Sequence, residues 1–158
     1  KPQPLQLSRL NISEFLKLLL IQIQELPEAI DRRIDFESHL PAGEVMADIN
    51  KLKQVFINLF RNACEAIDPH KSVSCSLGSE IDSNYIRIQI YNGGEQIPPE
   101  LLPQLTTPFC SSKSSGTGLE LAISKRIITD HDGKLTIASS SLGTTVSVYL
   151  PICCFDWQ

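Results

Sequence analysis

The segment from Asn50 to Ile67, NKLKQVFINLFRNACEAI, has the most regular apolar pattern in the chain and constrains its fold most. Its apolar residues recur at helical spacing and form one broad face, made of Leu52, Val55, Phe56, Leu59, Phe60, Ala63 and Ile67. Asp68-Pro69 ends the pattern, because the residue before a proline is disfavoured in helical conformation. A long amphipathic helix of this kind needs an apolar surface to cover.

Two β-hairpin patterns supply such a surface. The first pairs 72–81 with 85–91, and the second pairs 134–139 with 144–151 around Gly143. Because hairpin strands run antiparallel, we expect a mixed, mostly antiparallel sheet with helices on one face. The predicted fold class is therefore α+β, a two-layer α/β sandwich.

The remaining segments complete this outline. The patterns predict an entry strand at 5–12, a helix at 14–25 capped by Ser13, a strand at 30–40, a turn at PAGEV and a helix at 118–131. The total is two or three helices and five to seven strands. We expect a linker at 1–4, one domain at 5–152 and a tail at 153–158, within a longer protein.

Composition excludes several function classes. The net charge is −4, with no basic stripe, which argues against a nucleic-acid partner. No apolar run reaches the length of a membrane span, so we expect no membrane contact by this domain. The five cysteines are an odd number without a CxxC pair, which favours a reduced, cytoplasmic protein. We expect the isolated domain to be a monomer.

Three polar residues share one side of the helix at 50–67. Asn58, Asn62 and Glu65 fall at i, i+4 and i+7, opposite the apolar face. One interpretation is an ordinary solvated polar face. The other is that the two carboxamides supply oxygens to Mg²⁺, which prefers few protein oxygens together with phosphate and water.

Asn92 stands at the end of an apolar strand, followed by Gly93 and Gly94. The pattern is compatible with a simple glycine turn. It is also compatible with a binding site in which the Asn92 carbonyl accepts a hydrogen bond from an exocyclic amine.

The stretch SSKSSGTGLEL, residues 111–121, places two glycines directly before a helix. It lies within the long irregular segment 92–118, and such long connections tend to be functional or disordered. A flexible loop would explain the glycines. A phosphate site would also explain them, because glycines allow close approach and free N–H groups at a helix start attract anions. Lys113 adds a positive charge nearby.

Taken in order, these motifs resemble the ATP-binding catalytic domain of bacterial sensor histidine kinases, in the superfamily that includes gyrase-type and mismatch-repair ATPases. The resemblance covers about residues 5–152. Its motifs are QVFINLFRNACEAI for the N box, NGGEQIPPE for the G1 box, TPFCSSK for the F box and GTGLELAISKRIITDHDGKLTI for the G2 box and beyond, with GTTVSVYLP as the final strand. It implies a Bergerat-type fold with an ATP lid at 95–117.

The resemblance also implies site residues and ligands, with ATP and Mg²⁺ as cofactors. Asn62 would bind Mg²⁺ with support from Asn58, and these two with Lys113 form the implied catalytic set. The implied nucleotide contacts are Asn58, Asn62, Glu65, Asn92, Gly94, Ile97, Lys113, Gly116, Thr117, Gly118, Leu119 and Thr145.

The chain departs from the family pattern at three positions. Asn92 replaces an aspartate that reads adenine, and Gln96 and Glu120 replace glycines. A degenerate relative that acts as a regulatory or interaction module therefore stays open. So does a serine kinase or anti-sigma factor of the same fold.

The implied reaction is phosphoryl transfer, because Asn58 stands where hydrolytic relatives carry a glutamate base and an asparagine cannot act as one. The acceptor would be a histidine on a dimerisation helix preceding Lys1, and a response regulator would be the partner. Neither His39 nor His70 has the sequence setting of such an acceptor. His131 ends a predicted helix, where a cation would favour the helix dipole.

Overall fold

The computed structural model describes residues 4–39, 43–79, 84–94, 96–105 and 120–155. Within them the elements follow in the order β1 (Ser8–Asn11), α1 (Ile12–Ile23), η1 (Pro27–Ala29), β2 (Arg33–Ser38), β3 (Gly43–Ala47), α2 (Ile49–Glu65), β4 (Ser72–Ser79), β5 (Tyr85–Asn92), η2 (Leu102–Gln104), α3 (Glu120–Asp130), β6 (Lys134–Ser140), β7 (Gly143–Pro151) and β8 (Cys154–Phe155).

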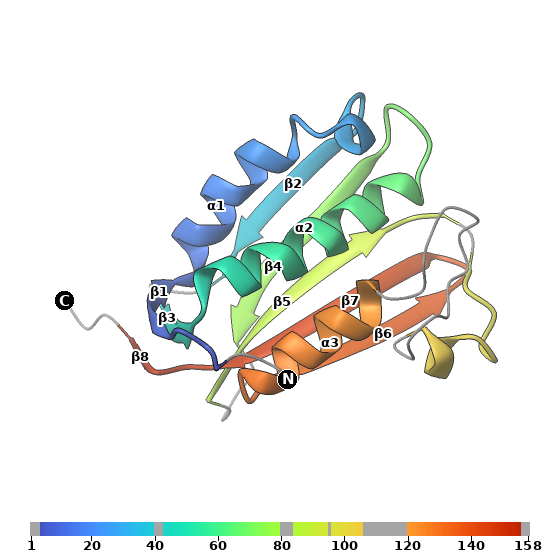
Figure 1. The fold of residues 1–158 in the computed structure, drawn as a ribbon. Coiled ribbons are helices and arrows are strands. Elements are labelled where there is room, and N and C mark those ends of the chain that lie inside the picture. The colour runs from blue at the N-terminus through green and yellow to red at the C-terminus, as the bar shows by residue number, and fades with distance from the viewer. Residues whose placement is uncertain (1–3, 40–42, 80–83, 95, 106–119, 156–158) are drawn as a thin grey trace.

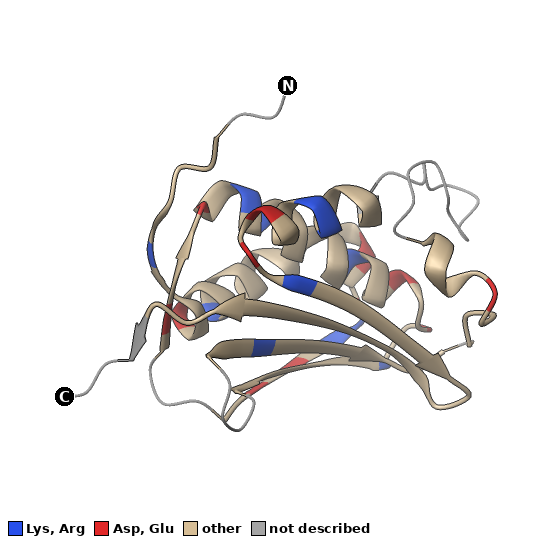
Figure 2. Ribbon diagram, turned by 90° about the horizontal axis from the view of Figure 1, so that it is seen from below, with Lys and Arg blue, Asp and Glu red and all other residues tan. Residues whose placement is uncertain are grey.

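The main sheet has five strands in the order β2-β4-β5-β7-β6. The β2–β4 pair is parallel, and the other three pairs are antiparallel. Figures 1 and 2 show α1, α2 and α3 on the same face of this sheet. The predicted two-layer α+β fold with a mixed, mostly antiparallel sheet and both predicted hairpins is therefore confirmed.

A second, small sheet has the order β1-β3-β8. Its strand β1 lies within the predicted entry strand at 5–12, but the pairing of β1, β3 and β8 into a sheet was not expected. Residues 43–45 are part of the predicted turn PAGEV, but they belong to β3, which pairs with β1 on one side and with β8 on the other. The strand count of eight among the described residues therefore exceeds the expected five to seven. These short strands are held by pairing between segments far apart in the sequence, which local patterns do not reveal.

Helix α2 lies at the centre of the helical layer. The Asp48 side chain caps it by accepting a hydrogen bond from the Lys51 N–H. Its apolar face is buried, and Phe56 packs edge-on against Phe15 of α1, with ring centroids 6.2 Å apart. The buried face fixes α2 over the sheet, and the rotation of α2 decides which polar residues face outward.

Helix α1 begins two residues earlier than its sequence pattern suggested. Asn11, rather than Ser13, is the N-cap, and its side chain accepts a hydrogen bond from the Glu14 N–H at 3.0 Å. Asparagine is as good an N-cap as serine, so propensity alone does not distinguish the two positions.

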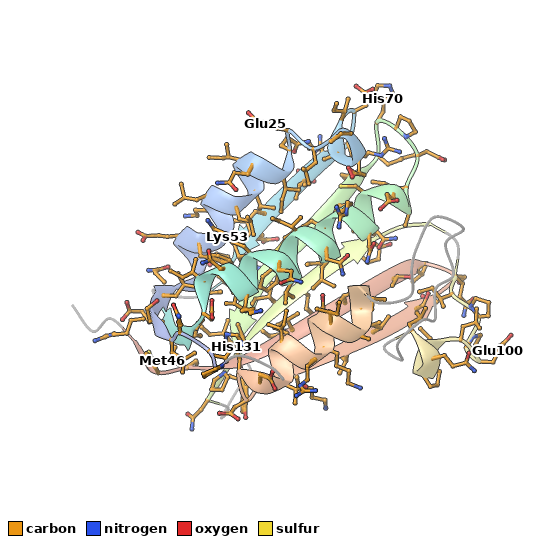
Figure 3. All side chains as sticks on the ribbon, in the orientation of Figure 1. Glu25, Met46, Lys53, His70, Glu100 and His131 are labelled. Carbon is orange, nitrogen blue, oxygen red and sulfur yellow. The ribbon has the colours of Figure 1, made fainter. Side chains whose placement is uncertain are left out.

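His131 anchors the end of α3 against the start of α2. It is 6% exposed, and its Nε2 lies 3.0 Å from the Asp48 backbone N while its Nδ1 lies 2.8 Å from the Ile127 carbonyl oxygen. Because an amide N–H can only donate, Nε2 is the acceptor and Nδ1 carries the proton. Both ring nitrogens therefore make contacts that join the end of α3 to the start of α2. Figure 3 shows His131 at the end of the molecule away from Glu100.

Lysine, arginine, aspartate and glutamate are interspersed over the described elements, as Figure 2 shows. In the part of the chain that the structure describes, no helix combines the length and the apolar character needed to cross a membrane.

Candidate functional site

An open cleft of about 1250 Å³ lies between the C-terminal half of α2, the end of β5, the segment that follows β5, and the β6–β7 hairpin. Apolar side chains form much of its wall, including Leu59, Ala63, Ile90, Ile137 and Val146. Polar side chains stand among them, including Asn62, Asn92 and Thr144. An apolar wall with a few placed polar groups is typical of a small-molecule site.

Of the three polar residues on one side of helix α2, two line the cleft and one does not. Asn62 is half-buried and lines the cleft together with the exposed Glu65. Asn58 is not among the lining residues: it is 5% exposed, and its Nδ2 donates to Ser124 Oγ of α3 at 3.3 Å. The solvated polar face considered for these residues does not describe Asn58, because α3 packs over that side of α2.

Asn92 ends β5 inside the cleft and is 7% exposed. Its Nδ2 donates to the Gly93 carbonyl oxygen at 2.8 Å. A carbonyl oxygen only accepts, so this contact orients the carboxamide and leaves Oδ1 as its acceptor. The side chain therefore has the polarity expected of a group that receives a hydrogen bond from an amine.

Gly94 fits tightly against the C-terminal end of α2. Its φ is +132°, and a Cβ at this position would lie 2.7 Å from the Ala66 carbonyl oxygen. Only glycine allows both this backbone conformation and this approach. Gly94 thus joins the end of β5 to the end of α2, the two elements that carry Asn92 and Asn62.

The segment after β5 is attached to the far side of the cleft through Ile97. The Ile97 N–H donates to Ser139 Oγ of β6 at 2.9 Å, and Ser139 Oγ lies 2.8 Å from Thr144 Oγ1 of β7. Ile97 and Thr144 line the cleft, but Thr145 does not. Neighbouring residues of a strand point to opposite faces, so the threonine on the cleft side is Thr144, one position before the expected Thr145.

Arg32 is a supporting residue that sequence reasoning missed. Its guanidinium donates to the Cys64 carbonyl oxygen at 3.1 Å and to the Ile67 carbonyl oxygen at 3.0 Å. Cys64 lies in the last turn of α2 and Ile67 lies two residues beyond the end of the helix, so Arg32 holds the point where the chain leaves α2. The contact spans more than thirty residues, and no local pattern around Arg32 indicates it.

Five of the expected contact residues lie outside the described residues: Lys113, Gly116, Thr117, Gly118 and Leu119. Most of the expected lid at 95–117 lies outside them as well. Glu120 is the first residue of α3.

Two features of the described residues fit a magnesium-bound nucleotide. Asn62 places a carboxamide at the cleft wall, and Gly94 removes the side chain that would fill the corner between β5 and α2. No cluster of three or more histidine, cysteine, aspartate or glutamate side chains suited to a metal occurs among the described residues. A carboxamide oxygen is a ligand that Mg²⁺ accepts beside phosphate and water.

The fold and the cleft define an α+β domain with a small-molecule site, and comparison with known proteins identifies the family. Residues 47–153 match the model of the histidine kinase-, DNA gyrase B- and HSP90-like ATPases. The chain belongs to this family.

Its relatives include the sensor histidine kinase ZraS of Escherichia coli (strain K12), to which it is 29% identical over 153 residues. That alignment covers 96% of this chain and 32% of the relative, so the chain spans about a third of the length of this curated relative.

The fold is similar to the crystallised catalytic domain of the histidine kinase ThkA, with a TM-score of 0.83, 28% identity, and coverage of 93% of this chain and 96% of that one. It is also similar to ThkA in complex with the response regulator protein TrrA, with a TM-score of 0.78, 25% identity, and coverage of 92% of this chain and 41% of that one.

Proposed function

We propose that this chain is the catalytic region of a sensor histidine kinase, which binds ATP with Mg²⁺ and donates the γ-phosphoryl group to a histidine on another segment of the protein. The observation that carries the proposal is the meeting of Asn62 and Asn92 at one cleft, joined by the glycine contact between Gly94 and Ala66. Family membership and the histidine kinase relatives support it.

Asn62 is the residue that would hold Mg²⁺, because its carboxamide is the one on this face of α2 that lines the cleft. When bound, the ion neutralises phosphate charge during transfer. Asn58 does not line the cleft, and its role is to hold α2 against α3 through the hydrogen bond to Ser124. This placement replaces the expectation that both carboxamides contact the metal.

Transfer is favoured over hydrolysis by the chemistry of Asn58. A carboxamide cannot take a proton from water, and Asn58 is buried and bonded to Ser124. The protein then contributes by positioning the nucleotide and by excluding water from around the purine ring.

The acceptor histidine and the partner belong to the wider protein in this proposal. His131 is buried in a structural contact, and His70 occupies a turn with a positive φ of 70°. A separate phosphoacceptor segment and a response regulator are therefore the proposed partners, with the complex of ThkA and TrrA as the model for the second. The cytoplasm, where ATP is available, is the proposed location.

Calorimetric titration with a non-hydrolysable ATP analogue tests the nucleotide site. We expect one-to-one binding that weakens when EDTA removes Mg²⁺. Absence of binding at millimolar nucleotide would instead support a degenerate, regulatory member of the family.

Incubation of the full-length protein with radiolabelled ATP tests the reaction. A phosphohistidine is labile to acid and stable to alkali, so we expect the incorporated label to show this pattern. An acid-stable label would identify a serine kinase of the same fold and contradict the proposal.

A further inference from the structure

One wall of the cleft is the stretch 65–72, which runs from the last residue of α2 to the first residue of β4. Most of its residues line the cleft: Glu65, Ala66, Ile67, Asp68, Lys71 and Ser72. We call this stretch the 65–72 wall. A connection between two elements is more mobile than the elements themselves, so the shape of this wall depends on the contacts that hold it.

Arg32 contacts the 65–72 wall without lining the cleft. Its Nε donates to the Cys64 carbonyl oxygen at 3.1 Å, and its Nη2 donates to the Ile67 carbonyl oxygen at 3.0 Å. A guanidinium presents its donors in a rigid planar fork. One side chain therefore fixes two carbonyls on either side of Glu65 and Ala66, the residues with which the wall begins.

Two backbone hydrogen bonds run beside the Arg32 side chain. The His70 N–H donates to the Asp31 carbonyl oxygen, and the Arg33 N–H donates to the Lys71 carbonyl oxygen at 3.1 Å. Residues 31–33 therefore lie along the wall, and Figure 1 shows the two connections side by side. These two bonds use main-chain atoms, so a change of the Arg32 side chain leaves their donors and acceptors in place.

Arg32 is itself fixed by α1. Gln24, the C-cap residue of α1, donates from Nε2 to the Arg32 carbonyl oxygen at 2.6 Å and to the Ala29 carbonyl oxygen at 3.1 Å. On the cleft side the wall meets Gly94, where a Cβ would lie 2.7 Å from the Ala66 carbonyl oxygen. Arg32 thus connects the end of α1 to the same short stretch that Gly94 contacts.

We propose that Arg32 is a positioning residue for nucleotide binding, because its guanidinium holds the 65–72 wall in the shape that the nucleotide contacts. This inference rests on the proposed function, that the cleft holds a nucleotide. A wall that is already ordered in the free chain loses less conformational freedom on binding, and the affinity is higher for that reason. The wall residues nearest the Arg32 contacts, Ala66 and Ile67, are apolar, so the part of the nucleotide that they suit is the face of its base.

Calorimetric titration of the parent 158-residue chain and of Arg32→Ala tests the inference, with a non-hydrolysable ATP analogue and with ADP, both in the presence of Mg²⁺. We expect Arg32→Ala to raise both dissociation constants by about three- to tenfold, the effect of losing one or two hydrogen bonds that hold the wall. The two factors should agree, because both ligands carry the same base. Arg32→Lys keeps the positive charge but not the fork, so we expect a smaller increase.

Two variants serve as controls, and urea unfolding shows that each variant is folded under the conditions of the titration. Arg33→Ala removes the neighbouring guanidinium, which is exposed and pairs with Asp35, and it is expected to leave both dissociation constants unchanged. Ile12→Val removes a buried methyl group at the start of α1, away from the cleft lining. It should lower the stability without changing the affinity.

Hydrogen exchange gives a local readout in the free chains. We expect the amides of the 65–72 wall to exchange faster in Arg32→Ala than in Ile12→Val, because only the first variant loses the contacts that hold this wall. Equal exchange of the wall amides in the two variants would contradict the role of Arg32.

The outcomes separate the inference from the function on which it rests. Failure of the parent chain to bind either nucleotide overturns the proposed function and the inference with it. Binding by the parent chain together with unchanged dissociation constants in Arg32→Ala overturns the inference alone. An equal loss of affinity in Ile12→Val also overturns it, since affinity would then follow overall stability. If Arg32→Ala does not fold, Arg32→Lys decides, and unchanged dissociation constants in that variant overturn the inference.

Discussion

Asn58 Nδ2 on α2 donates to Ser124 Oγ on α3 across 3.3 Å, in a contact where the two residues are 5% and 2% exposed. The other end of the Asn58 carboxamide, Oδ1, is buried and has no hydrogen-bond partner among the described residues. A buried polar atom without a partner destabilises the fold. The hydrogen bond to Ser124 is therefore the contact that offsets the burial of the Asn58 carboxamide, and it joins α2 to α3.

Ser124→Ala leaves Asn58 with neither of its side-chain groups bonded. We expect the free energy of unfolding to fall by about 1–2 kcal/mol, because a buried donor loses its partner. Urea unfolding measures this change, and a double-mutant cycle with Asn58→Ala isolates the pair. We expect the Mg²⁺ dependence of nucleotide binding to survive in Ser124→Ala. Its loss would contradict the separation of this pair from the metal site.

Asn62→Ala removes the carboxamide that lines the cleft. We expect nucleotide binding to lose its dependence on Mg²⁺, because the ion loses its ligand from α2. The fold should persist, since Asn62 is only half-buried, and circular dichroism checks this. Gln54→Ala is the matched control, as Gln54 is exposed on the same helix and does not line the cleft. Unchanged Mg²⁺ dependence in Asn62→Ala would contradict the metal assignment.

Gly93 and Gly94 are adjacent but differ in what they tolerate. In Gly94→Ala the new Cβ would lie 2.7 Å from the Ala66 carbonyl oxygen, at a φ of +132°. We expect a loss of about 2 kcal/mol or more in the free energy of unfolding, together with weaker nucleotide binding. In Gly93→Ala the nearest atom is Tyr91 Oη at 4.0 Å, so we expect little change. Equal thermal stability of the two variants would refute the close contact between β5 and α2.

The helices and hairpins of the main sheet could be predicted from the sequence because each has a strong local period. The small sheet could not, because β3 is stabilised by pairing with β1 and β8 at the two ends of the chain. The pairs Gly43–Phe155 and Ser8–Ala47 are contacts of long sequence separation, and neither β1 nor β8 exceeds four residues. The predicted strand at 5–12 contains β1, but its local pattern does not show which distant segment it pairs with.

Part of the candidate site could also be predicted from the sequence. The family motifs pointed to Asn62, Asn92, Gly94 and Ile97, all of which line the cleft. Thr144 lines the cleft and the expected contact Thr145 does not, because two adjacent threonines look alike in the sequence and the β5–β7 register decides which of them faces the helices.

The burial of Asn58 was not visible from the sequence for a different reason. A helical pattern shows which residues lie opposite the apolar face but not which second helix covers them, and α3 lies close to α2 on this side. The partner of His131 was equally hidden, since the Asp48 N–H that it accepts lies 83 residues away in the chain.

Asp48 predicts how stability depends on pH at the start of α2. The Gln6 backbone N–H bonds Oδ2 at 3.1 Å and is the main cause that holds the pKa of Asp48 below its ordinary value of 3.8. Because the folded pKa is lowered, the stabilisation is complete above pH 3.8 and is lost as the pH falls through the folded pKa. Asp48→Asn keeps a good N-cap but no charge.

We therefore expect Asp48→Asn to be less stable than the parent chain near pH 6, and the difference to shrink as the pH falls below 3.8. Urea unfolding of both proteins from about pH 6 to about pH 3 measures it. A difference that stays constant over this range would show that the carboxylate charge contributes nothing.

The cysteines differ in burial, and this predicts their reactivity. Cys64 and Cys75 are buried in the core, and burial raises the pKa of both thiols, that of Cys75 to about 12. Cys153 is exposed. Since the thiolate is the nucleophile, iodoacetamide at about pH 8 should alkylate Cys153 and leave Cys64 and Cys75 unmodified in the folded chain.

Peptide mass spectrometry after timed labelling measures each site separately. In guanidinium chloride, which exposes the core, Cys64 and Cys75 should react at rates similar to that of Cys153, so the protection of Cys64 and Cys75 in native buffer reports on folding alone. Alkylation of Cys75 in native buffer as fast as Cys153 would mean that β4, between β2 and β5, is not packed beneath the helices.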